Sequence, residues 1–263
     1  MNIEPDHIYN ADALEWMRAL PDGCVDACLT SPPYNFCLRV LGDKYVPRSK
    51  NERNFGGDVT NKYSNGLGDS LGMDEYFEWQ SACIEQMMRI STGVVFYNIQ
   101  IVSGNKPAVL RLLGRFADIV RDVLVWDKCA AEPAALPNVL NSEYELVVAF
   151  DHGNCKARQF RVFNAERGGL SNVLRVGKNR ENDYRAAFPV ALPTILVHNF
   201  TREGDLVCDP FMGSGTTAVA CHRTKRHFVG CELDPAGYAY TKFCGANIKQ
   251  NVYSGKGNII FFQ

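Results

Sequence analysis

The chain has no long apolar run. It contains no stretch of about eighteen consecutive apolar residues, which is the length that a membrane-spanning helix requires. Residues 1–12 mix charged and apolar side chains and lack the apolar core of a signal peptide. The sequence therefore predicts a cytoplasmic protein without a membrane partner.

Metal-ligand spacing is also lacking. The 10 cysteines are scattered, and no Cys-x-x-Cys pair with accompanying histidines occurs. Cys28, Cys208 and Cys231 lie in apolar runs, which is typical of reduced, buried thiols. We expect neither a metal site nor a disulfide framework.

Nor does the chain carry a global excess of positive charge. Its net charge of −1 provides no overall basic field for nucleic acid. The cations gather locally instead, in the segment from residue 152 to residue 185, where the acids are few. The basic residues there are Lys156, Arg158, Arg161, Arg167, Arg175, Lys178, Arg180 and Arg185. Such a local excess suits phosphate contacts, although a solvated, arginine-rich loop has the same composition.

Strand and helix patterns alternate along most of the chain, which predicts an α/β fold. The expected strands are 7–11, 25–29, 94–97, 119–126, 144–150, 206–208 and 228–231, and the expected helices are 14–20, 73–90, 106–115, 188–200, 214–223 and 235–248. Alternation of this kind favours a mostly parallel sheet with helices on both faces. We expect 119–126 and 144–150 to form an antiparallel ribbon at the sheet edge. The polar stretch 35–72 is predicted to be a mobile functional loop.

A glycine-rich segment follows the apolar strand 206–208. It reads Asp209-Pro210-Phe211-Met212-Gly213-Ser214-Gly215-Thr216-Thr217 and leads into a helix. The glycines permit a tight turn, and a helix N-terminus favours a carboxylate or phosphate. The next strand ends at Glu232, where a carboxylate is placed to bind ribose hydroxyls. Thr217 stands where a dinucleotide fingerprint has its last small residue, which disfavours a nicotinamide oxidoreductase.

A second short segment, Thr30-Ser31-Pro32-Pro33-Tyr34, follows the strand 25–29. The Ser31 hydroxyl and the Pro32 carbonyl can accept hydrogen bonds from both N–H groups of an exocyclic amine, and the two prolines fix the direction of the carbonyl. The Tyr34 ring offers a face on which a flat base can stack. Taken alone, the same four residues are also an ordinary turn with a buried tyrosine.

The Ser-Pro-Pro-Tyr segment comes before the glycine-rich segment in the chain. In that order, the two segments resemble those of the β class of amino-methylating DNA methyltransferases. The string DPFMGSGTTAVA followed by VGCELDP is similar to the S-adenosylmethionine loop of that family, and the resemblance covers roughly residues 5–34, 73–150 and 185–248. It implies a circularly permuted Rossmann-like methyltransferase fold. It also implies transfer of a methyl group from S-adenosyl-L-methionine to the amine of a base flipped out of double-stranded DNA.

The resemblance also assigns the site residues. The catalytic set is Ser31, Pro32, Pro33 and Tyr34. The cofactor-binding set is Asp12, Ala13, Phe188, Pro189, Asp209, Pro210, Phe211, Gly213, Ser214, Gly215, Thr216, Thr217 and Glu232. Asp12 is equally suited to cap the helix that follows it. The family has a histidine where Tyr184 or Arg185 stands here, so this segment departs from its pattern.

The resemblance divides the chain into functional parts. Residues 1–150 form the catalytic half, residues 185–250 the cofactor-binding half of the same domain, and residues 251–263 a tail. Between the halves, 151–184 occupies the place of a small target-recognition insertion. Its expected DNA contacts are Arg158, Arg161, Arg175, Lys178 and Arg180. Because this recognition segment is so small, it favours a short target site or a homodimer whose two subunits share recognition. A restriction endonuclease of the same system is a further expected partner.

The serine that begins the Ser-Pro-Pro-Tyr motif favours N4 of cytosine over N6 of adenine, because the aspartate-first form usually accompanies adenine in this family. No Pro-Cys dipeptide is present for covalent carbon-5 methylation. Protein amide methyltransferases share a Pro-Pro-Tyr pocket but normally place the cofactor motif first. An RNA methyltransferase and a catalytically silent DNA-binding module stay open as alternatives.

Overall fold

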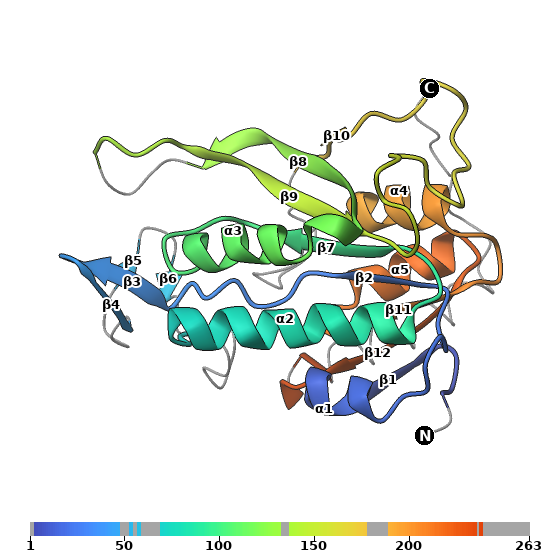
Figure 1. Ribbon diagram of the computed structural model, residues 1–263, viewed down its shortest axis with the longest axis horizontal. Helices are drawn as coiled ribbons and strands as arrows, with labels where there is room; N and C mark the ends of the chain where they lie inside the picture. The colour runs from blue at the N-terminus through green and yellow to red at the C-terminus, as the bar shows by residue number, and fades with distance from the viewer. Residues whose placement is uncertain are drawn as a thin grey trace.

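The computed structural model describes residues 3–47, 53–54, 57–58, 69–132, 137–177, 189–235 and 237–238. Within this part of the chain, one large sheet has the strand order β1-β12-β11-β2-β7-β9-β8-β10 (Figure 1). Its strands are β1 (His7–Asn10), β2 (Ala27–Thr30), β7 (Val95–Ile99), β8 (Val120–Glu132), β9 (Ser142–Phe150), β10 (Val173–Arg175), β11 (Leu206–Asp209) and β12 (His227–Glu232).

The sheet is mostly parallel, as predicted. Strands β1, β12, β11, β2 and β7 pair in parallel, and β9 runs antiparallel between β7 and β8. The predicted ribbon of β8 and β9 is therefore confirmed. Its place at the very edge is wrong, because the short β10 adds to β8 in parallel.

The order of the strands reveals how the two ends of the chain meet. The C-terminal strands β11 and β12 lie between β1 and β2 of the N-terminal half. Each C-terminal strand therefore has an N-terminal neighbour, β2 for β11 and β1 for β12. The halves predicted from sequence build one sheet, and their parallel strands end at the same edge.

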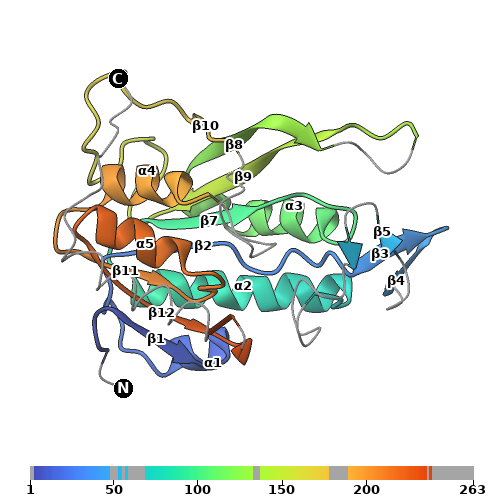
Figure 2. The same ribbon diagram turned by 180° about the vertical axis from the view of Figure 1, so that it is seen from behind.

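Helices cover both faces of the sheet (Figures 1 and 2). Helices α1 (Ala13–Arg18), α2 (Met73–Ile90) and α3 (Lys106–Arg115) pack on one face, and α4 (Ala191–Phe200) and α5 (Thr216–Arg223) on the other. Strand alternation supplies both cores, since Cys28 of β2 packs on the first face and its neighbours Ala27 and Leu29 on the second. The Cys28, Cys208 and Cys231 thiols are buried and free, as predicted.

The segment 35–72 is more regular than predicted. Strands β3 (Leu38–Leu41) and β4 (Lys44–Pro47) form an antiparallel hairpin, and β5 (Arg53–Asn54) pairs with β6 (Gly57–Asp58). The turn between β3 and β4 is Gly42-Asp43, and Gly42 has a φ of 59°. Glycine adopts this left-handed conformation without steric cost, which explains the tight hairpin. Figure 1 places this hairpin and the far end of the β8–β9 ribbon on the same side of the molecule.

Several predictions fall outside the described residues. These are the cofactor contact Phe188, the DNA contacts Lys178 and Arg180, most of the helix 235–248 and the tail 251–263. In the described part, the helix expected at 188–200 begins at Ala191. No helix among the described residues has the length and apolar character needed to cross a membrane.

Candidate active site

The two predicted motifs meet at the carboxyl ends of two neighbouring strands. Strand β2 ends at Thr30, directly before Ser31, and the adjacent β11 ends at Asp209, directly before the glycine loop. The Thr30 hydroxyl donates to Asp209 Oδ1 at 2.7 Å. This buried bond joins the Ser-Pro-Pro-Tyr segment to the glycine loop, at the edge where open α/β sheets bind ligands.

Asp209 shapes the loop from within. It is 2% exposed, and its carboxylate also accepts from the Thr217 hydroxyl at 2.6 Å and from the Phe211 N–H at 3.0 Å. Burial raises the pKa of Asp209 from 3.8 to about 6, while the hydrogen bonds from the two threonines and Phe211 oppose that shift. Both carboxylate oxygens accept hydrogen bonds from protein groups. Asp209 therefore holds the loop in place from inside the fold.

The glycine loop has the backbone that its sequence predicts. Gly213 and Gly215 have φ angles of 51° and 81°, and Gly215 precedes the first residue of α5. A third glycine, Gly230 of β12, escaped the sequence analysis. A Cβ atom there would lie 2.2 Å from the Asp209 carbonyl oxygen and 2.4 Å from Met212 Cε. Gly230 thus lets β12 approach the loop closely.

Glu232 lies beside the loop, as its position at the end of β12 predicts. Its Oε2 accepts from the Gly213 N–H at 2.8 Å, and its Oε1 accepts from the Asp234 N–H at 2.8 Å. Burial raises the pKa of Glu232, and both backbone bonds oppose that shift. These two bonds hold the Glu232 carboxylate against the glycine loop.

Asp12 caps helix α1. Its Oδ1 accepts from the Leu14 N–H at 2.9 Å and from the Glu15 N–H at 3.0 Å, the pattern of an N-cap. Because Asn10 pairs with Glu232 in the register of β1 and β12, Asp12 and the buried Ala13 also follow the sheet edge next to Glu232. The cap is established by these bonds, and contact with a cofactor stays a prediction.

The other described members of the predicted cofactor set belong to the glycine loop and the start of α5, except Pro189, which precedes α4. Pro189, Pro210, Ser214, Gly215, Thr216 and Thr217 are buried, whereas Phe211 and Gly213 are partly exposed. The Phe211 ring meets Trp79 of α2 edge-on, with their centroids 5.6 Å apart. The loop is thereby fastened to the helix that also supports the Ser-Pro-Pro-Tyr segment.

That segment is held from α2 and from the start of α3. The Pro33 carbonyl accepts from the Tyr76 hydroxyl at 2.8 Å and from Gln80 Nε2 at 3.1 Å. The Tyr34 carbonyl accepts from Asn105 Nδ2 at 2.9 Å. The carbonyl of Pro32 enters none of these bonds.

Tyr34 has a role that the sequence analysis missed. Its side chain is 8% exposed, and its ring packs near Phe36 with centroids 5.6 Å apart. Its hydroxyl lies 2.6 Å from Ser31 Oγ and donates to Glu145 Oε2 at 2.8 Å. Stacking of a base on the Tyr34 ring stays a prediction, and the hydroxyl is the part of the side chain that is engaged here.

Three further polar residues complete a buried cluster around this hydroxyl. Asn98 of β7 donates from Nδ2 to the Tyr34 hydroxyl at 2.6 Å and to Glu145 Oε2 at 2.7 Å. Lys128 of β8 lies 2.9 Å from Glu145 Oε1 and is 1% exposed. Asn98 has a local signal, because it is an amide in an otherwise apolar strand. Lys128 and Glu145 lie in strands with several other charged residues, so nothing in the local sequence singles them out. The strands that carry them come together through tertiary pairing.

The three predicted DNA contacts that the structure describes lie at opposite ends of the parallel strands. Arg175 ends β10, whose direction matches β8, so it lies at the edge that carries Ser31; its Nε is 3.6 Å from Asp127 Oδ2. Arg158 pairs with Asp122 near the start of β8, and Arg161 donates to the Thr92 carbonyl before β7. The latter two therefore lie at the opposite edge, and the structure does not bring them to the site.

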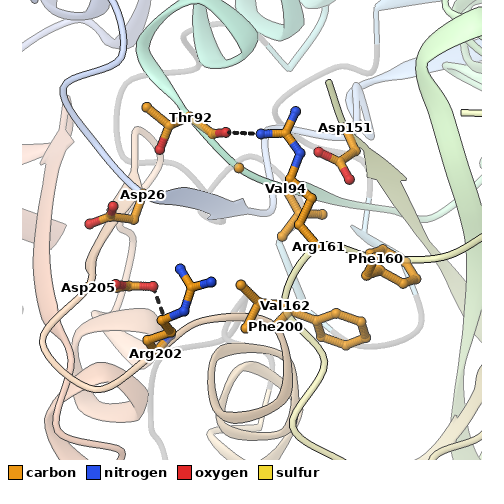
Figure 3. Close-up of a pocket in the computed structure, with 11 residues that line it drawn as sticks. Asp26, Thr92, Val94, Asp151, Phe160, Arg161, Val162, Phe200, Arg202 and Asp205 are labelled. Atoms are coloured by element: carbon orange, nitrogen blue, oxygen red, sulfur yellow. Dashed lines mark hydrogen bonds between the residues drawn. The ribbon is translucent and has the colours of Figure 1, made fainter. Parts of the chain in front are cut away.

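A cavity of about 230 Å³ occupies that opposite edge (Figure 3). Its lining includes Asp26, which precedes β2, and Asp205, which precedes β11, together with Arg161 and Arg202. Arg161 is tied to Thr92, and the backbone N–H of Arg202 donates to Asp205. The cavity is thus separated from Ser31 and the glycine loop by the length of the sheet strands.

Comparisons with known proteins give a consistent result. The family model N6_N4_Mtase, described as DNA methylase, matches residues 25–242. The type II methyltransferase M.XycI of Xanthomonas campestris pv. cyanopsidis is 27% identical over 271 residues, covering 87% of this chain and 83% of that protein. The type II methyltransferase M.BglII of Bacillus subtilis is 24% identical over 261 residues, covering 86% of this chain but only 65% of the length of M.BglII.

Solved structures resemble the fold over nearly its whole length. The PvuII DNA methyltransferase, described as cytosine-N4-specific, has a TM-score of 0.62 at 17% identity and covers 97% of both chains. M1.HpyAVI in its SAM complex has a TM-score of 0.59 at 22% identity, covering 90% of this chain and 98% of M1.HpyAVI. At such low identities, the similarity concerns the fold alone.

The raised pKa of Asp209 predicts a pH dependence of stability. Because the folded pKa of about 6 exceeds the ordinary aspartate pKa of 3.8, the stabilising contribution of the protonated group is complete below pH 3.8 and is lost as the pH rises through 6. Relative to Asp209→Asn, the unfolding free energy of the native chain should fall by roughly 2–3 kcal/mol between pH 4 and pH 8. Urea unfolding at each pH measures this difference.

The matched control is the exposed Asp118→Asn, which should track the native chain at every pH. An unfolding free-energy difference between the native chain and Asp209→Asn that stays constant over this pH range would contradict the assignment.

Proposed function

Because the chain belongs to the N6/N4 family of DNA methylases, we propose that it transfers a methyl group from S-adenosylmethionine to the exocyclic amine of a base flipped out of double-stranded DNA. The favoured acceptor is N4 of cytosine. The observation that carries this proposal is the bond between Thr30 and Asp209, which joins the amine-binding segment to the glycine loop at one sheet edge.

The residues around the glycine loop fit S-adenosylmethionine. The N-terminus of α5 suits the carboxylate of the methionine part. Glu232 suits the ribose hydroxyls, and Asp12 with the Ala13 backbone suits the adenine ring. When bound, the cofactor supplies an electrophilic methyl group on its sulfonium sulfur.

The Ser-Pro-Pro-Tyr segment suits an aromatic amine as the acceptor. The lone pair of such an amine is delocalised into the ring, so the nitrogen is a weak nucleophile. Hydrogen bonds accepted by Ser31 Oγ and the Pro32 carbonyl would draw the amine towards a tetrahedral shape as the new bond forms. The Pro33 carbonyl is already bonded to Tyr76 and Gln80, which supports Pro32 as the second acceptor.

Cytosine N4 is favoured over adenine N6 by the serine at position 31. Adenine N6 is the second candidate, because a serine hydroxyl accepts equally well from either amine. A homodimer and a restriction endonuclease partner stay predictions.

Loss of the Ser31 hydroxyl should remove most of the methyl-transfer activity and leave the affinity for S-adenosylmethionine unchanged. We expect Ser31→Ala to lower the methyl-transfer rate by about 100-fold or more, the scale of a lost hydrogen bond to a reacting group. The affinity for S-adenosylmethionine, measured by calorimetry, should change by less than about twofold, because Ser31 lies outside the loop. The exposed Ser103→Ala is the matched control. Full activity of Ser31→Ala would refute the amine-pocket role.

We propose that DNA binds at the carboxyl ends of the parallel strands, where both Arg175 and Ser31 lie. Replacing Arg175 with alanine should weaken DNA binding and lower the slope of log affinity against log salt by about one. Arg158→Ala removes the same side chain at the opposite edge and should leave both quantities unchanged. Fluorescence anisotropy over a salt series measures them. The reverse pattern, with Arg158 important and Arg175 silent, would overturn the choice of edge.

A further inference from the structure

The ion pair between Lys128 and Glu145 is unusual because it is almost completely buried. Lys128 is 1% exposed and Glu145 is 7% exposed, and their charged atoms lie 2.9 Å apart. Desolvation of two charges offsets most of their attraction, so a buried pair of this kind contributes little to stability by itself. A role in the neighbouring site is therefore a better explanation for its position.

The cluster fixes the direction of each hydrogen bond that leads to Ser31. A carboxylate only accepts, so the Tyr34 hydroxyl must donate its single proton to Glu145 Oε2. Tyr34 then has no proton for Ser31, and the 2.6 Å contact must be a bond from the Ser31 hydroxyl to the Tyr34 oxygen. The proton of Ser31 points into the protein, and its lone pairs are left for a ligand.

Asn98 reinforces the same direction. Its two N–H groups make short bonds to the Tyr34 hydroxyl and to Glu145, at 2.6 and 2.7 Å, whereas its distance to Ser31 Oγ is 3.4 Å. The Ser31 oxygen therefore keeps most of its accepting capacity. Within the described residues, Asn98 Oδ1 is buried without a hydrogen-bond partner, so the cluster as it stands has more acceptors than donors.

We propose that the Glu145 carboxylate, whose negative charge is balanced by Lys128, keeps the Ser31 oxygen available as a hydrogen-bond acceptor for the N–H of the target amine. The inference rests on the proposed function and names Glu145, Lys128 and the Tyr34 hydroxyl as positioning groups for the Ser31 pocket. As the amine nitrogen gains positive charge during methyl transfer, its N–H becomes a stronger donor. A chain of bonds that ends on a carboxylate stabilises that change through Ser31 and Tyr34.

Loss of the negative charge of Glu145 would reverse the direction of the hydrogen bonds between Glu145, Tyr34 and Ser31. A glutamine at position 145 can donate to the Tyr34 oxygen, which frees the tyrosine proton to point at Ser31. Ser31 would then receive a hydrogen bond from inside the protein and compete less well for the amine. Tyr34→Phe breaks the same chain by removing a single oxygen atom from the side chain.

The test uses the full chain, S-adenosylmethionine and a duplex substrate that the native protein methylates. Tyr34→Phe and Glu145→Gln are compared with Tyr144→Phe and Glu143→Gln, which make the same changes at exposed positions of β9. We expect kcat to fall about 10- to 100-fold in the first two variants and not in the controls, by analogy with the loss of hydrogen-bond partners that orient metal ligands. The KM for S-adenosylmethionine should change by less than about twofold.

A cycle with Ser31→Ala separates positioning from general damage to the fold. Because the chain acts through Ser31, adding Glu145→Gln to Ser31→Ala should cost less than threefold further, measured in single turnovers at high protein concentration. Independent, multiplying losses in the double variant would overturn the inference, as would native kcat in both Tyr34→Phe and Glu145→Gln. If the native chain transfers no methyl group to DNA, the proposed function itself fails. That outcome differs from an active native chain whose kcat is unchanged by Glu145→Gln.

Discussion

The carboxylate of Asp209 fastens together the two halves of the fold. It receives the Thr30 hydroxyl from the strand that leads to Ser31 and the Thr217 hydroxyl from the helix that follows the glycine loop. A buried carboxylate is costly unless donors surround it, and here the donors come from segments far apart in sequence. Asp209 therefore helps to fix the position of the Ser-Pro-Pro-Tyr segment relative to the glycine loop, together with the pairing of β2 and β11.

Glu145 has a comparable place on the other side of β2. It binds Lys128 from β8 and Asn98 from β7, and it receives the Tyr34 hydroxyl. Each of these two buried carboxylates accepts hydrogen bonds from several elements of the fold and helps to fix one side of the Ser31 segment. A methyl transfer needs its acceptor nitrogen held in line with the donor, and rigid strand ends meet that need better than a free loop would.

Much of the fold could be predicted from local pattern. The apolar strands ending at Thr30, Asp209 and Glu232 stand out because a polar or charged residue follows an apolar run. The glycine loop and the cap at Asp12 also have local signatures, because turns and helix starts depend on few residues. The β3–β4 hairpin was missed because its two strands are only four residues long and lie within a largely polar stretch, although the Gly42-Asp43 turn is a local hairpin signal.

The buried cluster could not be predicted in the same way. Lys128 and Glu145 meet only through the register of β8 and β9, and Asn98 joins them from β7. Such registers are set by tertiary packing and are not written in either strand alone. The same limit explains the DNA contacts: Arg158, Arg161 and Arg175 are near one another in sequence, but the chain crosses the sheet between them, so they reach opposite edges.

The central claim is methyl transfer to the exocyclic amine of a DNA base. The most direct measurement is incubation of the full chain with S-adenosylmethionine and unmethylated bacterial DNA, followed by nucleoside digestion and mass spectrometry. The account predicts N4-methylcytosine. N6-methyladenine would keep the mechanism and correct the base, whereas DNA without any methylated amine would contradict the account.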